Sequence, residues 1–183
     1  MSTHHFRDWY LRGWEYRENI DADGHCRGGL VYTGEYYSFG LSGDHFRQLK
    51  IRYLVLTAAL LFCYVLCSLD TPTGSRSVWG GACILAIIPL MYLLLGMCSL
   101  LRAKPEMTYR DRHLSWYRIH YSSMASVLLL AVAAVGQVIF ILRLPSPPAA
   151  DIRWLAGQII SLVLSIAILI ISFRFQPKMI IRD

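Results

Sequence analysis

Four long apolar runs constrain the fold of this chain more than any other feature. They cover residues 51–69, 78–101, 119–142 and 154–173. Each holds roughly 19 to 24 residues, and a helix of that length, rising about 1.5 Å per residue, crosses a hydrocarbon layer about 30 Å thick. Hydrocarbon offers no partner to unpaired backbone groups, and the runs lack the alternating polarity of barrel strands. The pattern therefore predicts four transmembrane helices.

The composition agrees with this prediction. Hydrophobic residues make up 55% of the chain and charged residues 16%, whereas charged residues approach about a quarter of a typical soluble domain. We expect an all-α integral membrane protein whose four-helix bundle occupies residues 50–174, between an N-terminal segment, 1–49, and a tail, 175–183. The N-terminal segment is polar and aromatic, so we expect the first helix to serve as an uncleaved signal anchor.

Basic residues predict the orientation of these helices. Of the 18 lysines and arginines, 15 lie before or at the start of the first run, between the second and third runs, or after the fourth. By the positive-inside rule, both termini and the middle loop should be cytoplasmic, as in a multi-pass plasma (inner) membrane protein. The net charge of +6 lies beside the apolar runs, so it indicates lipid contact and does not imply nucleic acid. The residues expected to contact lipid headgroups are Arg52, Arg102, Lys104, Arg118 and Arg174.

Outside the runs, residues 30–39 are rich in strand-favouring types and predict a short strand or β-hairpin. An isolated hairpin is marginal in water. We expect it to pack against other cytoplasmic pieces, against the tail at residues 174–181, or against a second chain. Thr108 and Asp111 resemble a capping box at the start of the third helix, and Pro89 is expected to bend the second.

The interiors of the four runs contain no Asp, Glu, Lys, Arg or His. This argues against ion-coupled transport, which places ionisable groups at depth. Gln137 and Gln158 fall at similar depths in the third and fourth runs. They are expected either to form an interhelical hydrogen bond or, with Tyr92, to bind a ligand.

Small residues recur along two of the runs. Gly157, Ser161 and Ser165 follow one another at every fourth position of the fourth run, and Ser122 and Ser126 do so in the third. Such stripes allow helices to approach closely. The sequence leaves open whether these faces pack inside one bundle or join two copies of the chain.

Cysteines and histidines give weaker signals. Cys67 and Cys83 both fall near the outer ends of their helices, so a redox-active disulfide is sterically feasible, although packing as a small apolar residue is the preferred interpretation. The six histidines lie in or beside the cytoplasmic segments and are interpreted as surface or interfacial residues. No zinc-type spacing, phosphate loop or catalytic motif occurs, so we expect no metal, no cofactor and no catalytic residues.

These observations favour a non-enzymatic membrane subunit that binds itself or a membrane-protein partner. One alternative is a passive or facilitated transporter or channel for a small neutral or amphipathic molecule. A second is a membrane thiol-redox or lipid-modifying enzyme. The tract at 31–37, leading into a four-run apolar body, resembles small bacterial inner-membrane proteins, and this resemblance implies no activity.

Overall fold

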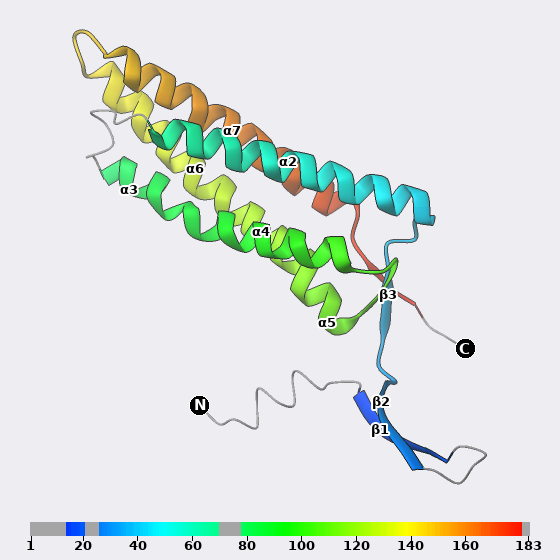
Figure 1. Cartoon of the computed structure of the whole chain (residues 1–183). Helices are drawn as coiled ribbons and strands as arrows, with labels where there is room; N and C mark the ends of the chain where they lie inside the picture. Colours follow the sequence, from blue (N-terminus) through cyan, green and yellow to red (C-terminus); the bar gives the residue numbers. More distant parts are fainter. Residues whose placement is uncertain (1–13, 21–25, 70–77, 181–183) are drawn as a thin grey trace, which may run out of the picture.

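The computed structural model describes residues 14–20, 26–69 and 78–180 of the chain. They form four long helices packed side by side, with two small β-sheets at one end (Figure 1). We call this end the sheet end and the other the loop end. Helices α2 (Gly43–Leu69) and α6 (Arg118–Leu142) begin at the sheet end, and α4 (Ile87–Arg102) and α7 (Ala149–Arg174) end there. The expected all-α helical bundle is confirmed.

All four helices are long and apolar enough to span a membrane. In the most apolar window of each, only 22–33% of the residues are buried inside the bundle. The other apolar side chains point outward, as Phe62 (64% exposed), Leu128 (65%) and Ile84 (66%) illustrate. A soluble bundle would bury such a face against its core. This outward display is the distribution that a hydrocarbon environment requires.

The first and last long helices are continuous. Helix α2 covers Gly43–Leu69 and helix α7 covers Ala149–Arg174. Helix α7 begins directly after Pro148, five residues before the apolar run from which its position was predicted. Proline favours the first turn of a helix, because the N–H that it lacks would have no partner there. Residues 149–153, which include Asp151 and Arg153, therefore belong to the helix and not to the loop.

The second long helix is interrupted. Helix α3, Val78–Leu85, stops at Ala86, and helix α4, Ile87–Arg102, continues from there. Pro89 lies one turn beyond this point and cannot donate the hydrogen bond that would reach the carbonyl of Leu85. The break therefore falls where the proline removes a backbone hydrogen bond.

The third long helix has three parts. Helix α5, Tyr109–Arg112, starts at a cap in which the Thr108 hydroxyl accepts a hydrogen bond from the Asp111 N–H at 3.2 Å, as the sequence predicted. A π-helical turn, η2, covers His113–Tyr117, and helix α6 continues over Arg118–Leu142. The cap precedes the apolar run, so the third long helix begins before its membrane-spanning part.

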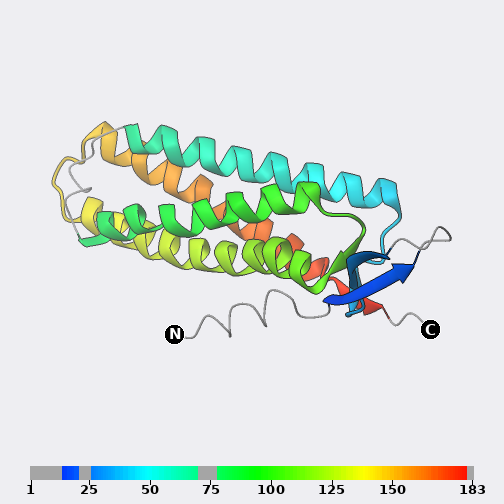
Figure 2. The same cartoon turned by 60° about the horizontal axis from the view of Figure 1, so that its bottom comes forward.

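Two glycines allow close helix packing. A Cβ on Gly96 of α4 would lie 2.9 Å from the Cβ of Arg118 and 3.1 Å from the backbone nitrogen of Ile119. A Cβ on Gly157 of α7 would overlap the Cys67 sulfur on α2. Side chains at these two positions would push α4 away from α6 and α7 away from α2. The four helices run together along the length of the bundle (Figure 2).

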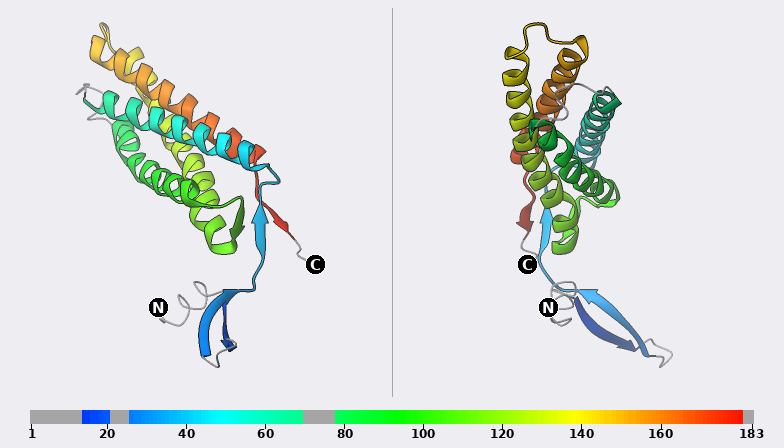
Figure 3. Two further views of the ribbon diagram at one scale, coloured as in Figure 1. Left: turned by 45° about the vertical axis from the view of Figure 1, so that its right-hand side comes forward. Right: turned by 90° about the vertical axis from the view of Figure 1, so that its left-hand side faces the viewer.

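The N-terminal segment forms a hairpin. Strand β1, Trp14–Ile20, pairs antiparallel with strand β2, Cys26–Tyr32, and the hairpin extends away from the bundle (Figure 3). The strand-rich tract at 30–39 was expected to contain a strand or hairpin. It supplies the end of β2 and a further strand, β3, at Tyr36–Ser38.

Strand β3 joins three distant parts of the chain. It pairs antiparallel with β4, Glu106–Thr108, on one side and with β5, Lys178–Ile180, on the other, which gives the order β4-β3-β5. The tract at 30–39 was expected to pack against other cytoplasmic pieces or against the tail. Its strand β3 pairs with the middle loop through β4 and with the tail through β5. We call β3, β4 and β5 the sheet platform.

Candidate functional site: the sheet platform and a buried polar seam

One face of the sheet platform packs against the bundle. Tyr37, Met107 and Met179 share one row of the register. Tyr37 and Met107 are buried, with 6% and 0% of their surface exposed, whereas Met179 on the edge strand is 53% exposed. Alternate residues of a strand point to opposite faces. Tyr37 on the central strand and Met107 on β4 therefore anchor the sheet to the bundle. Met179 leaves an apolar side chain exposed at the β5 edge.

Arg112 of α5 fixes the middle of the sheet platform. Its guanidinium carbon lies 4.3 Å from the centre of the Tyr37 ring and 4.9 Å from that of Tyr117. Such cation–π contacts contribute about 0.5–2 kcal/mol each, depending on exposure. The Tyr37 hydroxyl donates a hydrogen bond to the Glu35 carboxylate at 2.5 Å. This hydrogen bond, with burial, raises the pKa of Tyr37.

Tyr32 attaches the hairpin to the bundle. Its hydroxyl donates to the Glu35 carbonyl at 2.9 Å and accepts from the Tyr109 N–H, the first residue of α5, at 3.1 Å. Its ring meets those of Trp14 and Tyr36 edge to face, with centroids 5.4 and 5.2 Å apart. The start of α5 therefore contacts both the hairpin and the sheet platform.

Lys50 joins α2 to the end of α4. Its ammonium group donates hydrogen bonds to the Leu101 carbonyl at 3.0 Å and to the Ala103 carbonyl at 2.5 Å, and lies 4.6 Å from the centre of the Phe46 ring. The last carbonyls of a helix have no intrahelical partner, and a cation there interacts well with the helix dipole. Lys50 therefore caps α4 from a neighbouring helix.

An aromatic cluster surrounds the π-helical turn. The Trp116 ring stacks on His120 with centroids 5.0 Å apart, and its indole N–H donates to the Ser172 carbonyl at 3.3 Å. His120 Nδ1 hydrogen-bonds the Ser172 hydroxyl at 2.9 Å, and its ring meets Phe173 edge to face. His120 is only 9% exposed. A surface role is therefore wrong for His120, because the tryptophan and α7 cover it, whereas its position at the membrane interface remains a prediction.

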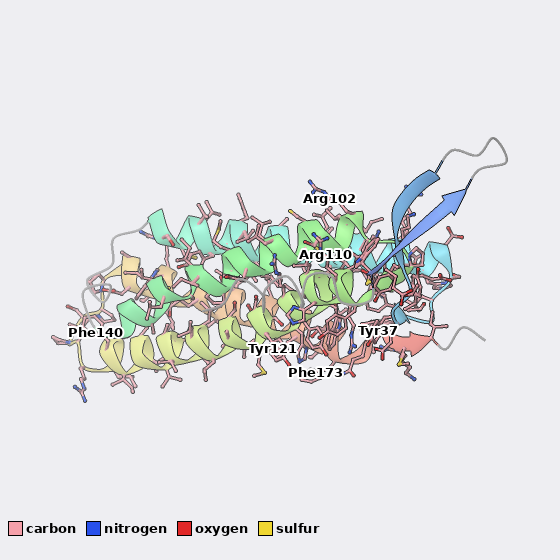
Figure 4. The ribbon with its side chains drawn as sticks, turned by 90° about the horizontal axis from the view of Figure 1, so that it is seen from below. Tyr37, Arg102, Arg110, Tyr121, Phe140 and Phe173 are labelled. Carbon is pink, nitrogen blue, oxygen red and sulfur yellow. The ribbon has the colours of Figure 1, made fainter. Side chains whose placement is uncertain are left out.

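A polar groove lies beside the sheet platform, between the end of α4 and strand β4. It has a volume of about 360 Å³. Its lining carries both signs of charge and three hydroxyl groups: Arg102, Lys104, Glu106, Asp111, Ser99, Thr108 and Tyr36, with Ala103. Figure 4 places Arg102 toward the sheet end of the bundle and Phe140 at the loop end.

The two glutamines do not pair with each other. The Gln137 amide donates to the Asp151 carboxylate at 3.2 Å, and both residues are fully buried. The Gln158 amide is 2% exposed, lies beside the Cys83 thiol, and finds no hydrogen-bond partner of ordinary geometry. Asp151 is a buried ionisable residue that lies just outside the predicted fourth run, because α7 begins earlier than predicted.

Helix α7 buries an unusual polar stripe. Its inward positions follow heptad spacing: Asp151, Trp154, Gln158, Ser161, Ser165, Ile168 and Ser172, all buried. Four buried hydroxyls have no hydrogen-bond partner among the residues that the structure describes: those of Ser161 and Ser165, of Ser126 on α6 and of Tyr53 on α2. We call Ser126, Gln158, Ser161 and Ser165 the polar seam. The apolar interior of the bundle thus contains a stripe of polar groups, while its outer face is also apolar.

The small-residue stripes are internal. Gly157, Ser161, Ser165, Ser122 and Ser126 are all buried within one chain, so none of them forms an exposed face for a second copy. The heptad period that includes Asp151 is visible in the sequence and could have revealed that residue. It was missed because the helix was placed by its apolar run alone.

The other predicted residues do not converge on one site. Tyr92 is 53% exposed on the outer face of α4, away from the buried glutamines. No disulfide joins Cys67 to Cys83. The five basic residues predicted to contact headgroups, Arg52, Arg102, Lys104, Arg118 and Arg174, all belong to the sheet end. Their contacts with lipid remain a prediction.

Within residues 14–20, 26–69 and 78–180, no group of three or more His, Cys, Asp or Glu side chains is placed to hold a metal ion. The chain matches no protein-family model, no curated protein and no solved structure. The function must therefore be argued from the geometry of the sheet platform, the groove and the seam.

Proposed function

We propose that this chain is a multi-pass plasma-membrane protein whose sheet end faces the cytoplasm, and that it works as a non-enzymatic binding subunit. The outward-facing apolar side chains of its four long helices support insertion. The concentration of lysine and arginine at the sheet end supports the orientation. Both termini and the middle loop would then share the cytoplasmic face.

The observation that carries this proposal is the exposed edge of the sheet platform. The strand order leaves β5 at an edge, where Met179 remains 53% exposed although its row partner Tyr37 is buried. An edge strand offers backbone donors and acceptors to a strand of another chain, and an apolar side chain beside it adds contact area. A partner strand added next to β5 would cover Met179.

The binding proposal can be tested by photo-crosslinking in cells. A photoreactive phenylalanine analogue replaces Lys178, which is exposed on β5, and in a matched control it replaces Arg143, which is exposed at the loop end. We expect a discrete crosslinked species from position 178 and none from position 143. Two differently tagged copies of the chain distinguish a second copy from another protein. Equal crosslinking at the two positions, or none at 178, would contradict the proposal.

A second function, facilitated passage of a small uncharged molecule, is favoured by the polar seam. Four polar side chains, each at most 2% exposed, lie on the buried faces of α6 and α7, and within the described part of the chain they find no hydrogen-bond partner of ordinary geometry. A buried polar group left unpaired costs about 1–3 kcal/mol, so a chain that needed only packing would gain by replacing these residues. Uncharged molecules that donate and accept hydrogen bonds would satisfy the seam, whereas ions would remain poorly solvated there.

Liposome flux tests this second function. Vesicles containing the protein are compared with protein-free vesicles for osmotic swelling in water and in glycerol, and the variant is Gln158→Leu. The proposal expects faster swelling with the native protein and a return to the protein-free rate in the variant. Native swelling no faster than that of empty vesicles would refute it.

A further inference from the structure

The groove beside strand β4 combines two cations with two carboxylates. Arg102 is the last residue of α4 and Lys104 follows it, whereas Glu106 belongs to β4 and Asp111 to α5. All four side chains are exposed. The volume of about 360 Å³ is at the lower end of the ~300–1,000 Å³ typical of small-molecule sites. The groove therefore suits a small ligand that itself carries both charges.

An apolar stripe on α4 leads directly to this groove. Ile88, Tyr92 and Leu95 are 57%, 53% and 50% exposed, and residues spaced three or four apart share one face of a helix. The same face continues to Ser99 and Arg102, which line the groove. Under the proposed membrane orientation, the stripe faces hydrocarbon and the groove lies at headgroup depth. A molecule bound there would have its polar part in the groove and its apolar part along α4.

We propose that this groove binds the headgroup of a phospholipid that carries a primary ammonium group, the phosphatidylethanolamine class. The inference rests on the proposed insertion of the bundle in a membrane. Arg102 and Lys104 would contact the phosphate, and Glu106 with Asp111 would accept hydrogen bonds from the ammonium. The acyl chains would lie along Tyr92 and Leu95.

The two carboxylates determine which lipid fits. A primary ammonium has three N–H donors for carboxylate oxygens, whereas the quaternary ammonium of phosphatidylcholine has none. Phosphatidylglycerol brings a negative charge without a compensating cation, so its headgroup would meet Glu106 and Asp111 with repulsion. Arg102 and Lys104 alone would bind the phosphate of any phospholipid. Glu106 and Asp111 make the groove selective for phosphatidylethanolamine.

Lipid selection can be measured by native mass spectrometry of the full chain in mild detergent. The protein is incubated with equal amounts of phosphatidylethanolamine, phosphatidylcholine and phosphatidylglycerol that have distinguishable masses and matched chain lengths. We expect the first lipid to be retained about fivefold over each of the others, the scale of one solvent-screened charged contact. Equal retention of the three lipids, or a preference for phosphatidylglycerol, would overturn the proposal.

Three variants test which residues cause the preference for phosphatidylethanolamine. Glu106→Gln should reduce the preference for phosphatidylethanolamine over phosphatidylcholine to less than about twofold, and the pair Arg102→Gln with Lys104→Gln should lower retention of all three lipids. Arg174→Gln is the matched control, because this arginine also lies at the sheet end but outside the groove. Loss of the preference in the control, or its persistence in Glu106→Gln, would contradict the assignment. Crosslinking at Lys178 does not depend on Glu106, so the partner-binding proposal can fail or hold separately.

Discussion

Arg112 and Tyr37 are 75 positions apart in the sequence, yet the guanidinium carbon of the arginine lies 4.3 Å from the centre of the tyrosine ring. This contact fixes β3, from the segment before the first long helix, to the helix that begins the third. Tyr37 in turn pairs with Met107 and Met179 in the two neighbouring strands. A single side chain on α5 thereby stabilises a sheet built from three separate parts of the chain.

We predict that Arg112→Gln loosens the sheet platform while leaving the helical bundle folded. Loss of the contacts with Tyr37 and Tyr117 should cost about 1 kcal/mol, because glutamine has no cationic face to place over the rings. Hydrogen exchange of the β3 and β5 amides should become faster, with little change in α6. Arg143→Gln, at the exposed loop end, should change neither. Unchanged exchange in β3 would mean that the arginine does not hold the strand.

The hydrogen bond from Tyr37 to Glu35 predicts a pH dependence. It is the main cause that raises the pKa of Tyr37 above the ordinary value of 10.0. The folded state therefore favours the protonated phenol, so this contribution to stability is complete below pH 10 and is lost as the pH rises through the higher, folded pKa. The phenolate absorbance of the native protein minus that of Tyr37→Phe should show one group titrating above pH 10. A difference titration centred at or below pH 10 would exclude this effect.

Gly157→Ala should destabilise the bundle, because the new methyl group would overlap the Cys67 sulfur. Overpacking of this kind typically costs about 1–3 kcal/mol. A second substitution, Cys67→Ala, removes the sulfur and should restore most of the loss, as thermal unfolding in detergent can measure. Gly81→Ala is the matched control, since a Cβ there meets no atom within 4 Å. Equal losses at the two glycines would show that helix contact is not the cause.

Gly96→Ala should behave differently. Its Cβ would meet the Cβ of Arg118 at 2.9 Å and the backbone nitrogen of Ile119 at 3.1 Å. No shortening of a side chain to alanine removes those atoms, so Arg118→Ala should fail to rescue the variant, in contrast to the rescue expected at Gly157. The same unfolding measurement compares the two pairs, and full rescue by Arg118→Ala would contradict the close approach of α4 and α6.

Gln158→Leu should make the bundle more stable and, if the polar seam conducts small molecules, less active. Leucine has a similar size and leaves no unpaired amide, so the variant should be more stable by about 1–3 kcal/mol. If the seam carries small uncharged molecules, the same variant should lose flux. Lower stability on unfolding would show that the amide has a structural partner and is needed for packing.

The bundle could be predicted from the sequence because hydrocarbon imposes a simple length rule on apolar runs. The starts of helices depend instead on local signals. Thr108 with Asp111 was recognised, whereas Pro148 was not used, and Asp151 was therefore placed in a loop. The pairing of β3 with the middle loop and the tail could be predicted only as one of several possibilities. Strands of three residues leave no pairing pattern in a single sequence.

The candidate sites also depend on packing that a single sequence does not reveal. A mostly polar stripe with heptad spacing in α7 is visible in the sequence. The failure of Gln158 to pair with Gln137, however, depends on how the helices are rotated about their axes. The role of Arg112 could not be predicted, since its contact with Tyr37 arises only when the sheet folds against η2. Tyr92 was expected to bind a ligand together with the glutamines, but the rotation of α4 places it on the outer face.

The central claim, that the sheet platform forms at the cytoplasmic end of membrane-crossing helices, is tested most directly by cysteine accessibility in intact cells. Single cysteines replace Lys178 on β5 or Arg143 at the loop end in a chain from which the five native cysteines have been removed. With a membrane-impermeant maleimide, we predict labelling at position 143 in intact cells and at position 178 only after permeabilisation. Labelling at 178 in intact cells would contradict the account.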